Sequence, residues 1–88
     1  MSYYVQGPNE VLEYEFAWAN VIPESSSIVS SVWTATGLTL AGESVIGTTT
    51  VAKISGGTLG QKYIVENLVN LSNGETYKTS MFILFEVK

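Results

Sequence analysis

Short segments of alternating apolar and polar residues run through most of the chain, and this two-residue period predicts β-strands. The clearest segment, residues 11–19, has an apolar face made of Leu12, Tyr14, Phe16 and Trp18. Its opposite face carries Glu13 and Glu15, which we expect to be solvated, because a strand with one buried face turns polar side chains outward. The segment therefore predicts a half-buried strand that packs its aromatic side chains against a second layer.

Residues 28–35 predict another strand. Its inner face consists of Val29, Ser31, Trp33 and Ala35, because side chains alternate along a strand. We expect Trp33 to be the central aromatic residue of the core, since a Trp that serves as an exposed sugar-binding platform usually has companions beside it. Residues 48–54, which are rich in Thr and Val, predict a thin strand at a sheet edge.

A glycine-rich turn at residues 56–60 leads into a strand at residues 61–71. One face of that strand consists of Tyr63, Val65, Asn67, Val69 and Leu71. The pattern is typical of a tyrosine corner, in which a buried tyrosine ring packs between two sheets and its hydroxyl group bonds to the backbone a few residues upstream. In the immunoglobulin fold a cysteine follows this tyrosine by two residues, and here that position is Val65.

Residues 76–87 predict the last strand, which a turn at Asn73-Gly74 joins to residues 61–71 as a β-hairpin. No segment shows a helical period of useful length. About seven short strands therefore predict an all-β fold, an immunoglobulin-like antiparallel β-sandwich. A small SH3-like or OB barrel is the alternative, which the tyrosine corner and Trp33 disfavour. The structural core should include Trp33, Tyr63, Val65, Phe16 and Tyr14.

Two apolar segments lie outside this expected core. Residues 1–10 predict an N-terminal arm or edge strand ahead of a single sandwich domain at residues 11–88, and the arm begins with Tyr3, Tyr4 and Val5. In the last strand, Phe82 and Leu84 lie on the face opposite the core positions, so they need cover from either the arm or a neighbouring protein. The candidate interface residues are therefore Tyr3, Tyr4, Val5, Phe82 and Leu84.

Composition removes most kinds of chemistry. The 88 residues contain no Cys, His, Asp or Arg, and their charged residues are eight Glu and four Lys. Without thiols or imidazoles we expect no catalytic site, no metal site and no cofactor. A net charge of −4 with scattered lysines disfavours nucleic acid as a partner. With neither a signal-peptide pattern nor a membrane-length apolar run, we expect no membrane partner and synthesis in a cytoplasm.

Three stretches of the sequence resemble a known family. They are Val-Leu-Glu-Tyr-Glu-Phe-Ala-Trp-Ala-Asn from residue 11, Ser-Ser-Val-Trp-Thr-Ala-Thr-Gly-Leu-Thr-Leu from residue 30, and Val-Ala-Lys-Ile-Ser-Gly-Gly-Thr-Leu-Gly-Gln-Lys-Tyr-Ile-Val-Glu-Asn from residue 51. Over about residues 10 to 87 the chain is similar to small immunoglobulin-like structural proteins of tailed phages, the fibre-tail adaptors. The resemblance implies a non-catalytic virion protein, made in the host cytoplasm.

The same resemblance implies other virion proteins of the tail, fibre, neck or capsid as partners, and a homo-oligomer in the particle. Two other functions remain open from the sequence. The protein could be a head decoration or cement protein that bridges capsomers. It could instead be a carbohydrate- or protein-binding module of a surface adhesin, although the missing secretion signal counts against that function.

Overall fold

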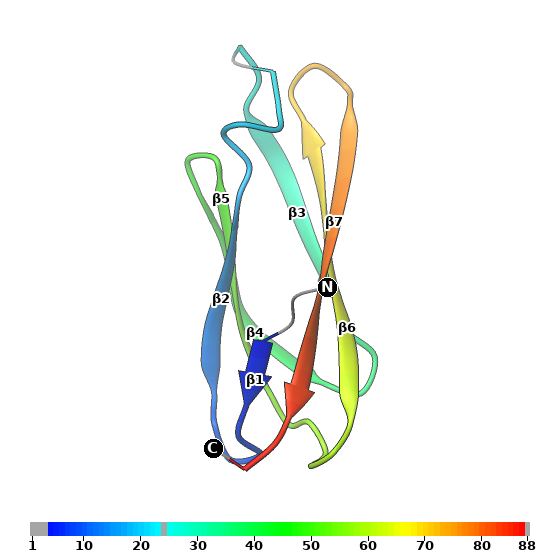
Figure 1. The fold of residues 1–88 in the computed structure, drawn as a ribbon. Helices are drawn as coiled ribbons and strands as arrows, with labels where there is room; N and C mark the ends of the chain where they lie inside the picture. The colour runs from blue at the N-terminus through cyan, green and yellow to red at the C-terminus, as the bar shows by residue number, and fades with distance from the viewer. Residues whose placement is uncertain (1–3, 24, 88) are drawn as a thin grey trace.

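The computed structural model describes residues 4–23 and 25–87, which form seven strands in two sheets and contain no helix. The strands are β1 (Tyr4–Gln6), β2 (Leu12–Ala17), β3 (Ile28–Thr34), β4 (Thr39–Ile46), β5 (Thr49–Ser55), β6 (Lys62–Leu71) and β7 (Thr76–Phe85). One sheet has the strand order β1-β7-β6-β3, and the other has the order β2-β5-β4. Figure 1 shows the two layers face to face. The prediction of an all-β sandwich is confirmed.

The strand order is that of an immunoglobulin domain. Strands β2, β5 and β4 pair as strands B, E and D of a constant-type domain do, and β3, β6 and β7 pair as strands C, F and G. The first strand departs from the expected antiparallel arrangement, because β1 pairs with β7 in parallel, with Tyr4 beside Ile83 and Gln6 beside Phe85. A parallel pair needs a long connection. Here that connection is the rest of the sandwich, which no local sequence pattern could reveal.

The Thr- and Val-rich strand is central, not an edge strand as its composition suggested. Strand β5 lies between β2 and β4, and Ala52 and Ile54 are fully buried in it. Even Val51, on the opposite side of the strand, is buried. The prediction was wrong because the size of the side chains depends on how much room there is above and below the sheet. It does not determine whether the strand has neighbours on one side or on both.

The predicted inner face of residues 28–35 is interrupted near its start. The pairing of β3 with β6 shifts between Ile28 and Ser30, which leaves Val29 as the extra residue of a β-bulge. Val29 is 68% exposed as a result, while Ile28 packs against the core. An inserted residue reverses the alternation of side chains, so the period read from Trp33 does not extend back to Val29.

The hairpin between β6 and β7 has a longer turn than a two-residue Asn-Gly turn. Only Gly74 has a positive φ, of 90°, and its N–H group donates to the carbonyl oxygen of Leu71. The N–H group of Leu71 in turn donates to the carbonyl oxygen of Glu75, which closes a three-residue loop. Asn73 contributes through its side chain, whose Oδ1 accepts from the N–H group of Glu75.

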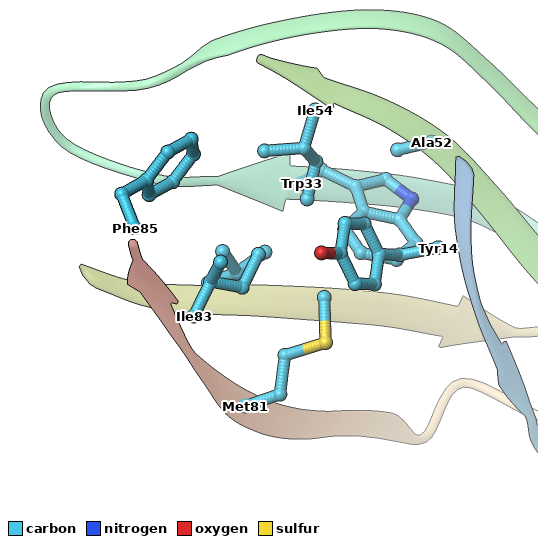
Figure 2. Packing of buried hydrophobic residues seen from close by; sticks show 8 residues of the cluster. Tyr14, Trp33, Ala52, Ile54, Met81, Ile83 and Phe85 are labelled. Carbon is cyan, nitrogen blue, oxygen red and sulfur yellow. The ribbon is translucent and has the colours of Figure 1, made fainter. Parts of the chain in front are cut away.

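The two sheets meet in a core with an aromatic centre. The rings of Phe16 and Trp33 stack with centroids 5.2 Å apart and planes inclined by 15°. The surrounding cluster comprises Tyr14, Trp33, Ala52, Ile54, Val65, Met81, Ile83 and Phe85, most of which Figure 2 shows. A second buried cluster, Trp18, Ile22, Val69 and Leu71, adjoins it at Phe16. Ile83 and Phe85 face this core, so Leu84 between them and Phe82 before them face outward.

Candidate docking surface

The outer face of the four-stranded sheet carries a contiguous apolar patch, made of Val5, Ile64, Phe82 and Leu84. The register of the sheet brings them together, because Val5 lies beside Leu84 and Ile64 lies beside Phe82. Ile64 is 53% exposed and Val5 is 37% exposed. We call these four residues the outer patch. Val32 and Leu68 form a separate apolar pair farther along the same face.

Phe82 and Leu84 are half-buried, and a side chain of the same sheet lies over the Phe82 ring. The ammonium group of Lys62 lies 5.9 Å from the centre of the Phe82 ring. Strand β1 lies beside β7 in the plane of the sheet rather than across this face. Strand β1 therefore widens the outer patch through Val5, and the described residues of the arm lie beside the patch rather than over it.

Tyr4, the described one of the two adjacent tyrosines of the arm, does not belong to the outer patch. Tyr4 shares the sheet side of Ile83, and its ring meets the Tyr14 ring edge-on with centroids 5.4 Å apart. It remains 54% exposed at the rim of the sandwich. Tyr3, the other predicted interface tyrosine, lies outside the described residues.

Charged side chains border the outer patch. Lys78 forms an ion pair with Glu66, with 3.5 Å between Nζ and Oε2, and this pair separates the outer patch from Val32 and Leu68. A shallow hollow of about 400 Å³ opens beside Ile64. Its lining consists of Thr34, Thr36, Lys62, Tyr63, Ile64 and Glu66. The patch thus has an apolar centre and a polar rim, the usual layout of a protein interface.

Tyr63 makes the hydrogen bond expected of a tyrosine corner. Its hydroxyl oxygen accepts from the N–H group of Thr58 at 2.8 Å. Hydrogen bonding with Thr58, first with its side chain and then with its backbone, lowers the pKa of Tyr63. The Tyr63 ring is half-buried and meets the Phe85 ring edge-on, 5.5 Å between centroids. Gly57, in the turn before Tyr63, lies so close to the Phe85 ring that an added Cβ would overlap the ring, so this position favours glycine.

Two buried polar groups that the sequence patterns did not single out tie the sheets together. Asn67 is fully buried, and its Oδ1 accepts from the hydroxyl of Thr50 at 2.6 Å and from the indole N–H of Trp18 at 3.2 Å. Its amide group donates to the Ser31 hydroxyl and to the carbonyl oxygen of Val32. Asn67 therefore joins β6 to β3 and β5 at once.

Gln6 plays the corresponding part for β1. It is fully buried, and its amide group donates to the carbonyl oxygens of Glu10 and Ile54. Its Oε1 accepts from the Tyr14 hydroxyl at 3.0 Å. Burial, followed by the nearby Glu10 carboxylate, raises the pKa of Tyr14. A polar residue among apolar ones in the 63–71 face was a visible signal for Asn67, whereas nothing in the sequence marked Gln6.

Within the described ranges, no group of three or more His, Cys, Asp or Glu residues is placed to hold a metal ion. None of the described segments forms a helix long and apolar enough to cross a membrane.

A family model described as Podophage GP4 fiber-tail adaptor protein gp77 matches residues 6–84 of the chain. The chain belongs to this fibre-tail adaptor family. No curated protein matches the chain at a significant level. The resemblance inferred from sequence is confirmed, and it establishes a structural protein of the phage tail as the class of molecule.

The adaptor match covers strands β2 to β6 completely, and it includes the last residue of β1 and all of β7 but Phe85. It begins at Gln6, the buried end of β1, and ends at Leu84 in the outer patch. Ile64 and Phe82 lie within it as well, whereas Val5 lies one residue before it. The region matched by the fibre-tail adaptor family therefore includes most of the sheet that bears the patch.

Proposed function

We propose that this protein is a non-catalytic adaptor that attaches fibre or other tail components to the phage tail, and that the outer patch is one of its contact surfaces. The observation that carries the proposal is the exposed apolar face on the sheet β1-β7-β6-β3. A free sandwich domain gains nothing by exposing Ile64 and half-exposing Phe82. A partner that covers them removes apolar surface from water.

The size and composition of the chain support a contact role over catalysis. Its described surface brings together no acid–base pair with a nucleophile, and function has to be argued from a site. The proposal also includes repeated copies around the tail axis, since closed rings are the common way in which identical subunits assemble. Its place is the virion, after synthesis in the host cytoplasm.

Quantitative mass spectrometry of purified virions tests this function. Heads and tails are separated, and the amount of this chain is compared with that of the major capsid protein. If the chain is an adaptor, we expect it in the tail fraction at a few copies per particle. A copy number close to that of the capsid protein, in the head fraction, would instead identify a decoration protein. Absence of the chain from virions would refute a virion role and favour a surface-binding module.

A further inference from the structure

The edge of β7 is only partly covered. Strand β1 pairs with β7 over Ile83–Phe85, so among the described residues the segment Thr76–Phe82 has a neighbouring strand on one side only. Figure 1 shows β1 beside only the end of β7 that leads to the C-terminus. We call the segment Thr76–Phe82 the open edge.

The direction of the main-chain groups on this open edge follows from the hydrogen bonds at its far end. The N–H group of Phe85 donates to Gln61, on the β6 side, and the N–H group of Glu86 donates to Gln6, on the β1 side. These directions alternate along a strand. The N–H and carbonyl groups of Lys78 and Ser80 therefore point away from β6, toward the uncovered side.

The other sheet edges carry features that discourage strand addition, and the edge strand β1 is only three residues long. The pairing of β3 is interrupted at Ile28–Ser30, and that of β4 is interrupted at Ala41–Ser44. Strand β2 presents Glu13 and Glu15 in alternation. Bulges and charges are the usual protections of an exposed edge. The open edge of β7 pairs with β6 in unbroken register and bears one charged side chain, that of Lys78.

A hollow of about 170 Å³ lies beside this open edge, between β7 and the end of β2. Its lining consists of Phe16, Ala17, Trp18, Val21, Tyr77, Lys78 and Thr79. The volume is similar to the ~150 Å³ of an apolar protein cavity that holds a benzene ring. An aromatic or aliphatic side chain fits it, and Val21, 56% exposed, stands at its margin.

We propose that the open edge of β7 binds an extended segment of a different tail or fibre protein, which adds to the four-stranded sheet as a further strand and places one apolar side chain in the hollow. Unpaired main-chain groups in a row are matched by another strand, and a pocket beside them selects the side chain that alternates inward. The identity of the partner as a tail or fibre protein rests on the proposed function. The site itself is distinct from the outer patch, which gives the adaptor a second attachment surface.

A second copy of this chain fits the open edge poorly. Two copies paired through their Thr76–Ser80 segments about a two-fold axis would place Lys78 across from Lys78 of the second copy, and like charges directly opposite each other destabilise a strand pair. The remaining edges of a second copy are that of β1, which is only three residues long, the bulged edges of β3 and β4, and the acidic edge of β2. A segment from another polypeptide carries neither restriction.

Matched variants in assembled virions test the proposal. Lys78→Pro removes an N–H group that points away from β6, and a proline is tolerated at such a position. Lys78→Ala is its control, because both variants lose the ion pair with Glu66. Val21→Glu places a charge at the hollow, and Val29→Glu places one at an exposed valine on the far edge. We expect retention of one fibre or tail protein to be about tenfold lower in Lys78→Pro than in Lys78→Ala virions, and about tenfold lower in Val21→Glu than in Val29→Glu virions.

Photo-cross-linking from position 78 in virions identifies what occupies the open edge. A benzophenone side chain there should react with a segment of another virion protein in which apolar residues alternate. Cross-links only within this chain or to a second copy would overturn the proposal, as would equal retention in the Lys78→Pro and Lys78→Ala virions. If Lys78→Pro fails to fold, Val21→Glu against Val29→Glu decides. Absence of the wild-type chain from tails is the separate result that overturns the proposed function.

Discussion

The three-stranded sheet turns Glu13, Glu15 and Lys53 outward and buries Ala52 and Ile54, as a half-solvated sheet is expected to do. The four-stranded sheet departs from that arrangement on both of its faces. Its outer face bears the apolar outer patch, and its inner face buries two amide side chains, those of Gln6 and Asn67.

The two faces of the four-stranded sheet therefore differ in what they contribute to this small domain. Burying the amide groups of Gln6 and Asn67 costs free energy, and only well-formed hydrogen bonds offset that cost. Because these bonds form in one relative position of the two sheets, they favour a single alignment. The apolar residues outside contribute little to that alignment and are available to a partner. The polar interior of the four-stranded sheet thus holds the two sheets in register, and its apolar exterior is the surface that we propose for binding.

The largest expected effect comes from making the outer face of the four-stranded sheet polar, like that of the three-stranded sheet. Phe82→Ser combined with Leu84→Ser should leave the thermal unfolding midpoint near that of the wild type, because neither side chain belongs to the buried core. Incorporation into virions should fall at least about a hundredfold, since central apolar anchors dominate interface energies.

The matched control for this pair is Glu13→Ser with Glu15→Ser, two outward positions on the other sheet. Incorporation of the control should stay within about twofold of the wild type. Quantitative mass spectrometry of virions measures both. If the Phe82/Leu84 variant no longer folds, these residues stabilise the domain itself, and the contrast between the faces fails.

The next effect tests the polar interior. Asn67→Ala should lower the free energy of unfolding by about 3 kcal/mol, because it leaves a cavity and deprives the Thr50 hydroxyl of its acceptor in a dry environment. Asn70→Ala is the control on the outer side of the same strand, with an expected loss below about 1 kcal/mol. Urea denaturation followed by Trp fluorescence measures both variants. Equal losses would show that the buried network is not special.

The sequence predicted those features of the structure that depend on neighbouring residues, and it missed those that depend on residues far apart in the chain. Alternation and the Asn73-Gly74 turn are local, and they located the last two strands and the sandwich class correctly. Pairing between the two ends of the chain is not local, so the parallel β1–β7 contact was missed. The bulge at Val29 broke an otherwise valid alternation. Outward placement of Phe82 and Leu84 could be read from their spacing, but the position of β1 beside them could not.

A smaller effect should follow from the second buried amide. Tyr14→Phe leaves Oε1 of Gln6 without its donor, and we expect a loss of about 1–2 kcal/mol at neutral pH. Circular dichroism during urea denaturation measures it. A loss below about 0.5 kcal/mol would show that water replaces the tyrosine hydroxyl at this site.

The same variant has a pH signature. Because the pKa of Tyr14 is raised above 10.0 in the folded protein, its neutral form is favoured there, and the stability it contributes is fully present below pH 10.0. Above that pH the unfolded chain loses the Tyr14 proton first, so the wild type loses stability. Tyr14→Phe should lose stability less steeply between pH 10 and the higher folded pKa. Parallel pH curves for the two proteins would contradict the assigned cause.

The smallest effect concerns the charges at the border of the outer patch. Lys78 and Glu66 are both substantially exposed, with side chains 56% and 40% accessible, so water screens their attraction. Lys78→Ala should therefore lower the free energy of unfolding by no more than about 0.2–1 kcal/mol. Thermal unfolding at low and high salt measures this, and the small difference from the wild type should shrink further at high salt. A loss comparable to that of Asn67→Ala would mean that the outer face of the four-stranded sheet also determines stability, and the division of its two faces into folding and binding would no longer hold.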